Sequence, residues 1–118
     1  MNLYKLHNEP RTLDGYDEMD KLENTSIKET EQTGATYKNV FGELNRPDGP
    51  AYITAAGSEF WYRFGKKHRE NGPAVIYDNG TKFWYIDGEL HRTDGPAVIY
   101  DGNNIEYWIN GKQVDELI

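Results

Sequence analysis

The chain has 118 residues, of which 36% are apolar and 14% aromatic, and it contains no cysteine. Its formal net charge of −7 argues against a groove that tracks phosphates and against an electrostatic hold on anionic lipid. The length favours one domain, the lack of cysteine excludes disulfides and thiolate sites, and no run is apolar enough to predict a membrane helix or secretory signal.

The first 33 residues form an acidic arm that differs from the rest of the chain. They carry four basic and eight acidic side chains. Residues 3–7 form a short apolar cluster that residues 8–10 interrupt, whereas residues 21–33 are polar, lack a hydrophobic face and predict a linker. Two interpretations stay open: an arm that becomes ordered on a partner, or a strand or short helix that caps the first repeat.

From residue 34 onward the sequence repeats with a period of 23 residues. Three blocks align without gaps, and a degenerate half-repeat precedes them; in this alignment Tyr37 falls one period before Phe60. The predicted division is a half-repeat at 34–44, repeats at 45–67, 68–90 and 91–113, and a terminal strand at 114–118.

Each block has the pattern of one β-hairpin. Residues 73–77 are rich in strand-forming types and end at Asp78-Asn79-Gly80, which favours a tight turn. Residues 82–86 form a second such run, which ends at Asp87-Gly88. The recurring histidines, glycines and prolines are therefore predicted to be structural: His68, His91, Gly49, Gly72, Gly95, Pro50, Pro73 and Pro96.

Because a lone hairpin is only marginally stable in water, successive hairpins are expected to pair edge to edge. The predicted fold is all-β, with tandem 23-residue hairpin repeats in one elongated, twisted antiparallel sheet. Period-2 alternation places Phe60 and Tyr62 on one face and Trp61 on the other. Glu106 stands where the other blocks have phenylalanine, so the last repeat is expected to be more polar on that face.

The copies of aromatic-x-x-Gly-x-x-His at residues 85–91 and of His-Arg-x-Asp/Asn-Gly-Pro-Ala at 68–74 and 91–97 resemble MORN-like repeats. The resemblance is to a variant form found in small proteins of bacteria and their phages. Arg69 and Arg92 stand where the standard form has a second glycine. The resemblance implies an elongated, curved sheet used for recognition, and some relatives look like antitoxin or immunity proteins.

The three histidines are the first candidates for catalysis, but His68 and His91 recur with the repeat, and only His7 stands apart. Repetition favours a structural role, in which a ring nitrogen ties the turn between hairpins. The sequence has no phosphate-binding glycine loop, no nucleophile elbow and no clustered histidine ligands. We therefore expect no enzymatic activity, no metal site and no cofactor.

Aromatic and arginine side chains supply the candidate binding surface, because Trp, Tyr and Arg dominate the energetics of protein interfaces. One aromatic row must form the core, while a more exposed row would meet a partner; a solvated structural row is the alternative for the arginines. The predicted partner-binding residues are Trp61, Tyr62, Trp84, Tyr85, Tyr107, Trp108, Arg69 and Arg92.

The leading functional hypothesis is a cytoplasmic protein-binding module that acts as a stoichiometric inhibitor or an immunity or antitoxin-like factor. Such a factor would occlude a bacterial toxin or defence protein, as a phage anti-defence protein does. The alternative is an assembly protein that forms homo-oligomers through the sheet edge near residues 105–118. Direct binding of nucleic acid or membrane is disfavoured by the charge.

Overall fold

The computed structural model of the chain describes residues 13–117, with side chains from residue 18 onward. The apolar cluster at residues 3–7, the break at residues 8–10, His7 and Ile118 lie outside the described residues. The elements are α2 (Leu13–Glu23), β1 (Ile27–Glu31), β2 (Gly34–Lys38), β3 (Tyr52–Thr54), β4 (Glu59–Phe60), β5 (Tyr62–Arg63), β6 (Lys66–Lys67), β7 (Val75–Ile76), β8 (Lys82–Phe83), β9 (Tyr85–Ile86), β10 (Glu89–Leu90), β11 (Val98–Ile99), β12 (Ile105–Ile109) and β13 (Lys112–Val114).

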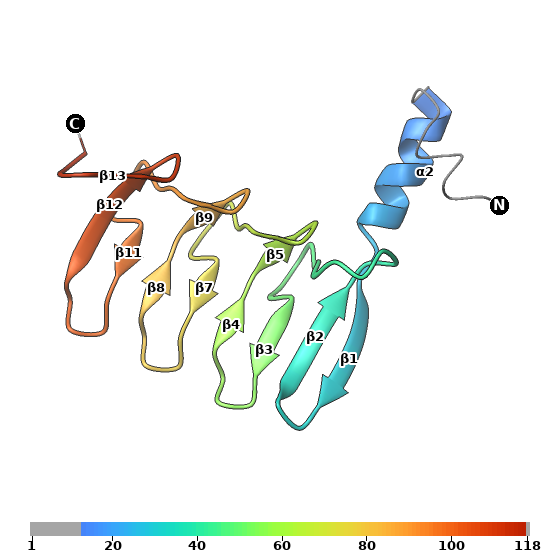
Figure 1. Ribbon diagram of the computed structural model, residues 1–118, viewed down its shortest axis with the longest axis horizontal. Helices are drawn as coiled ribbons and strands as arrows, with labels where there is room; N and C mark the ends of the chain where they lie inside the picture. Colours follow the sequence, from blue (N-terminus) through green and yellow to red (C-terminus); the bar gives the residue numbers. More distant parts are fainter. Residues whose placement is uncertain (1–12, 118) are drawn as a thin grey trace.

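Nine of these strands form one antiparallel sheet in the order β1-β2-β3-β4-β7-β8-β11-β12-β13. Figure 1 shows its hairpins side by side, with their turns along one long side of the sheet. The molecule measures 52 × 40 × 18 Å, so its shortest dimension suits one layer of strands with side chains on both faces. The predicted all-β fold of hairpin repeats in one large antiparallel sheet is confirmed.

The second strand differs from the prediction in the repeats at 45–67 and 68–90, because it is divided between two sheets, whereas β12 in the last repeat is continuous. β4 ends at Phe60 and β5 begins at Tyr62, in a separate two-stranded ribbon with β6. At the break, the Trp61 N–H donates to the Ala74 carbonyl at 2.6 Å, and the Trp61 carbonyl accepts from the His68 N–H at 3.0 Å. Tryptophan thus connects the main sheet to the ribbon, and Trp84 repeats the arrangement between β8 and β9.

The core of the repeats lies along the strand pairs and is built from small side chains. The fully or almost fully buried apolar residues there are Ala51, Ala74, Val75, Ala97 and Val98. Val75 pairs with Phe60 on one side and with Phe83 on the other, so neighbouring repeats share this packing. The stability of each repeat therefore depends on its neighbours.

The linker predicted at residues 21–33 is wrong, because this segment contains the end of α2 and the whole of β1. β1 pairs with β2 over five residues, from Ile27 with Lys38 to Glu31 with Gly34. All five β1 residues are exposed, so the strand has no apolar pattern and is held by its backbone hydrogen bonds. The described part of the arm corresponds to the capping interpretation.

Hydrogen bonds of Thr25, which follows α2, attach the helix to the sheet. Met19 is buried, and the Thr25 hydroxyl accepts a hydrogen bond from the Val40 N–H at 2.9 Å. The Asn45 side-chain amide donates to the Thr25 carbonyl at 3.1 Å. α2 extends beyond the start of β1 at the N-terminal end of the sheet (Figure 1), and no helix within residues 13–117 is long and apolar enough to cross a bilayer.

The half-repeat also differs from the gapless alignment, since Tyr37 occupies the place of Trp61 and not that of Phe60. The Tyr37 N–H donates to the Ala51 carbonyl, and the Tyr37 carbonyl accepts from the Asn45 N–H. The additional residue is accommodated in the loop at residues 39–43, which the Asn39 side chain closes by accepting from the N–H groups of residues 41 and 43.

The terminal strand predicted at residues 114–118 is wrong in its bounds. β13 ends at Val114, which pairs with Tyr107 on β12. Asp115 lies one 23-residue period after Arg92. In the other repeats the two-stranded ribbon has ended at this position, and the loop that contains Arg69 or Arg92 begins. The strand therefore ends where that loop begins.

Candidate partner-binding surface

One face of the sheet carries a continuous series of aromatic rings. Tyr52 stacks on Phe60, with ring centroids 5.4 Å apart, and Phe60 meets Tyr77 edge to face at 5.7 Å. Phe83 continues the series, with centroids 5.8 Å from Tyr77 and 6.2 Å from Tyr100. We call this surface the aromatic face; it consists of Tyr52, Phe60, Tyr62, Tyr77, Phe83, Tyr85 and Tyr100.

Strand register explains why these rings meet. Tyr52 on β3 pairs directly with Phe60 on β4, and the side chains of directly opposed residues share a face. Tyr77 and Tyr100 follow two residues after Val75 and Val98, which returns them to that face. Tyr77 is 39% exposed and Tyr100 is 38% exposed, so the aromatic face is open to a partner.

Tyr62 and Tyr85 extend the aromatic face toward the ribbons. Burial raises the pKa of the Tyr62 hydroxyl, and the nearby Tyr77 raises it further. Burial likewise raises the pKa of Tyr85, with smaller contributions from Tyr77 and Tyr62. The Lys67 ammonium lies 5.1 Å from the centroid of the Tyr85 ring. These tyrosines are thus partly desolvated, as anchors of an interface often are.

The aromatic face ends in a polar cluster in the last repeat. Glu106 accepts hydrogen bonds from the Tyr100 hydroxyl at 3.1 Å and from the Trp108 indole N–H at 2.9 Å. The hydrogen bond to Glu106 is the main cause that raises the pKa of Tyr100. Trp108 therefore lies beside the aromatic face, held by a carboxylate that replaces a phenylalanine ring.

The other predicted aromatic row is covered by arginine. The Arg69 guanidinium carbon lies 3.9 Å from the Trp61 ring centroid, and that of Arg92 lies 4.1 Å from the Trp84 centroid. Arg46 covers Tyr37 in the same way at 3.9 Å. Each arginine also donates through Nη1 to the carbonyl of the proline four residues later, at 3.1–3.2 Å. These cations are therefore engaged within the protein.

Tyr107 completes that row without such a cover. Asp115 occupies the position that would supply its arginine, and no arginine lies over Tyr107 in the part of the chain that the structure describes. Glycine makes the close arginine approach possible elsewhere: a Cβ on Gly95 would lie 2.7 Å from the Arg92 guanidinium carbon. Gly49 and Gly72 face their arginines similarly, at 2.7 and 3.0 Å.

Both repeat histidines accept a hydrogen bond from the following turn, which is the contact expected from the sequence. The Asp87 N–H donates to His68 Nδ1, and the Asn110 N–H donates to His91 Nδ1, each at 3.0 Å. Asn45 replaces histidine in the first block, and its side-chain oxygen accepts from the Phe64 N–H at the same distance. The donors Asp87, Asn110 and Phe64 have φ of 48°, 50° and 52° and each precedes a glycine, as a type I′ turn requires.

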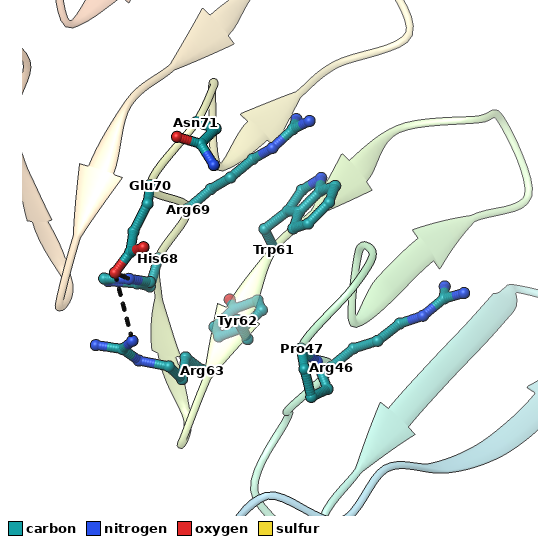
Figure 2. Close-up of a pocket in the computed structure, with 9 residues that line it drawn as sticks. All are labelled: Arg46, Pro47, Trp61, Tyr62, Arg63, His68, Arg69, Glu70 and Asn71. Atoms are coloured by element: carbon teal, nitrogen blue, oxygen red, sulfur yellow. Dashed lines mark ion pairs between the residues drawn. The ribbon is translucent and has the colours of Figure 1, made fainter.

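Two cavities lie between successive loops, which contain Arg46, Arg69 and Arg92 in turn. The first, of about 300 Å³, contains Trp61, Arg63, His68 and Glu70 in its wall. Figure 2 shows Arg63, His68 and Glu70 gathered on one side of this cavity, whereas Arg46 and Arg69 extend in parallel on the other. The second, of about 520 Å³, lies one repeat further along, next to Trp84 and His91. Within residues 13–117, no group of three or more His, Asp or Glu side chains has a metal-binding arrangement.

The structure divides the predicted site residues between two faces. Tyr62, Tyr85 and Trp108 lie on or beside the aromatic face, whereas Trp61 and Trp84 lie under Arg69 and Arg92. Sequence reasoning missed Tyr52, Tyr77 and Tyr100. In each Pro-Ala-Val-Ile-Tyr run the tyrosine follows two residues after the valine. Alternation along the strand would therefore have placed Tyr77 and Tyr100 on the same face as the buried valines.

Comparison with known proteins returned no matching protein-family model, no similar curated protein and no similar solved structure.

Proposed function

We propose that the chain is a protein-binding repeat module that docks a partner protein on its aromatic face. The observation that carries this proposal is an open row of contacting rings on a single-layer sheet, with Tyr77 39% and Tyr100 38% exposed. No second layer covers these rings within residues 13–117. Tyrosine suits such a surface because it supplies a large, rigid contact area with a polar tip.

The proposed mode of action is stoichiometric occlusion of the partner, in the cytoplasm, by an inhibitor or an immunity or antitoxin-like factor. A net charge of −7 favours association with a basic protein surface, such as one that normally holds nucleic acid. A phage protein that blocks a bacterial toxin or defence protein is the form that best suits a small acidic chain. The MORN-like resemblance favours this recognition role and stays a prediction.

Assembly through the sheet edges is the alternative function, and the open outer edge of β1 favours it. Edge strands present unpaired backbone groups that another strand would complete. β1 is five residues long and fully exposed, but it carries Lys28, Glu29 and Glu31, charges of the kind that protect edges from pairing. β13 has only three residues. These features favour a face over an edge as the binding surface.

The test is purification of the tagged protein from cells that contain its natural partners, with light scattering to measure the stoichiometry of any complex. Tyr77→Ser with Tyr100→Ser removes two exposed rings from the aromatic face. Ile105→Ser is the matched control, because Ile105 is 46% exposed and pairs with Ile99, the neighbour of Tyr100 that points to the opposite face.

We expect one enriched partner in a defined complex, lost in the double tyrosine variant and kept in the control. Circular dichroism establishes that each variant is folded. A complex that survives the tyrosine changes and disappears with Ile105→Ser would place binding on the other face. A homo-oligomer with no second protein would favour the assembly function.

A further inference from the structure

The first inter-repeat cavity contains unusual hydrogen-bonding groups. Three buried side-chain nitrogens in the described residues have no hydrogen-bond partner: Trp61 Nε1, Arg63 Nε and His68 Nε2. All three residues line this cavity of about 300 Å³. Buried N–H groups in native proteins are almost always paired, so a shared cavity with three unpaired donors indicates a missing acceptor.

His68 is the most buried of these residues, with 8% of its surface exposed. Its Nδ1 accepts from the Asp87 N–H at 3.0 Å, so in the neutral ring the proton is on Nε2, which then acts as a donor. The Asp87 carboxylate lies 3.3 Å from Nδ1, but this tautomer has no proton between them. Nε2 is therefore a buried N–H donor without an acceptor, in a residue that lines the cavity.

Glu70 indicates which chemistry the cavity accepts. Its Oε1 lies 3.6 Å from His68 Nε2 and 3.7 Å from an Arg63 guanidinium nitrogen, beyond the usual hydrogen-bond range (Figure 2). The Glu70 side chain is 69% exposed, so it lies at the rim of the cavity. The Glu70 oxygen thus lies near His68 Nε2 and Arg63 Nη1 without a hydrogen bond to either. Arg63 Nη2 donates to the Asp87 carboxylate at 3.3 Å, which leaves Arg63 Nε without an acceptor.

The repeat itself provides a comparison, because the next cavity along the sheet has no counterpart of Arg63. Ile86 occupies the position of Arg63, and Thr93 occupies that of Glu70. The residues that line the first cavity include three arginines and one glutamate, in a protein that is acidic overall. The second cavity is lined instead by two arginines and two carboxylates, Glu70 and Asp94.

We propose that this cavity binds a carboxylate group, supplied by a Glu or Asp side chain of the partner protein, which displaces Glu70 and accepts from His68 Nε2 and Arg63. Charge-assisted hydrogen bonds to a carboxylate are among the strongest that these donors form. Because the carboxylate comes from a partner protein, the inference rests on the proposed protein-binding function. It adds a polar, orienting contact away from the aromatic face.

The experiment is a titration followed by nitrogen-15 NMR of the Trp61 indole N–H and the Arg63 Nε–H signals. The probe is a capped pentapeptide with one central glutamate between alanines, and its control is the same peptide with glutamine. We expect saturable shifts with the glutamate peptide only. No saturable shift, or equal shifts with both peptides, would overturn the proposal, and equal shifts with the same concentration of acetate would assign the site to small carboxylates instead.

Two variants copy the next repeat, so their side chains suit the fold. Arg63→Ile should weaken peptide binding at least about tenfold, because it removes a charged donor. Glu70→Thr should tighten binding about threefold, because it removes a competing exposed carboxylate. Unchanged affinity in either variant, with circular dichroism showing a folded protein, contradicts the assignment.

The titration needs no natural partner, so its outcome is distinguishable from that of the proposed function. Tyr77→Ser with Tyr100→Ser leaves the cavity residues in place and should leave the peptide affinity unchanged. A peptide that binds while no partner complex forms would count against the aromatic face alone. A partner complex that tolerates Arg63→Ile would count against the carboxylate site alone.

Discussion

At the scale of single residues, the arginine of each repeat has a structural role, because its guanidinium covers an aromatic ring. The Arg92 guanidinium lies over Trp84 and also donates to the Pro96 carbonyl at 3.1 Å. Gly95 leaves the space that this arrangement needs, since a Cβ there would lie 2.7 Å from the guanidinium carbon. A planar guanidinium is able to stack and donate at once, which an ammonium group is not.

The coupling between Gly95 and Arg92 is testable by a double-mutant cycle. Gly95→Ala should destabilise the protein by about 1–2 kcal/mol, because the added methyl group displaces a stacked, hydrogen-bonded cation. In an Arg92→Ala background the same change should cost less than about 0.5 kcal/mol. Urea unfolding measures both costs, and equal costs in the two backgrounds would show that the glycine serves another purpose.

The tyrosines of the aromatic face should make stability depend on alkaline pH. Burial raises the folded-state pKa of Tyr62 and Tyr85 above 10.0, the value for a free tyrosine. The folded state then holds these protons more tightly than the unfolded state, so stability is fully present below pH 10 and falls as the pH rises through the folded pKa. We expect Tyr62→Phe with Tyr85→Phe to flatten this decline, as measured by urea unfolding between pH 8 and pH 11. An unchanged slope would contradict the assignment.

At the scale of elements, the hairpin repeat could be predicted because its information is local. Turn residues such as Asp78-Asn79-Gly80 and the strand-forming runs around them recur at a fixed spacing, and the observed hairpins follow them. The division of the second strand at Trp61 and at Trp84 was not predictable, since it depends on backbone hydrogen bonds to two different neighbours. The cover of arginine over tryptophan likewise depends on residues eight positions apart, on either side of a two-stranded ribbon.

β1 and the additional residue in the loop after Tyr37 were not predicted either. A fully exposed edge strand has no apolar alternation, so its sequence resembles a linker. The aromatic face was predicted in part: Tyr62 and Tyr85 lie on it, whereas Trp84 has a covered ring. Which of two aromatic rows stays open depends on the arginines, whose side-chain positions the spacing alone does not give.

The N-terminal cap should protect only the strands next to it. Met19→Ala removes a buried side chain of α2 and should loosen the attachment of β1. Because repeats interact mainly with their neighbours, amide hydrogen exchange should become faster in β1 and β2 and stay unchanged in β11 and β12. Uniformly faster exchange along the sheet would indicate that the cap and the repeats unfold as one unit.

At the scale of the whole molecule, the fold gives a large surface for few residues. The radius of gyration of the Cα atoms is 16.8 Å. A compact domain of this length would have about 13–14 Å. The thin sheet leaves both faces open to solvent, which suits recognition better than enclosure of a substrate.

Small-angle X-ray scattering tests this extended shape. We expect a radius of gyration of at least 16.8 Å for a monomer, with light scattering to verify the mass. A monomer near the value for a compact domain would mean that the sheet folds back on itself in solution and covers one face.

The central claim is that the aromatic face is open in the free protein and covered in the complex. Tyrosine-selective chemical labelling, read by mass spectrometry with and without the purified partner, tests it most directly. We predict that Tyr77 and Tyr100 react in the free protein and are protected in the complex, while Tyr37, covered by Arg46, reacts slowly in both. Equal labelling of Tyr77 and Tyr100 in the free and bound protein would contradict the claim.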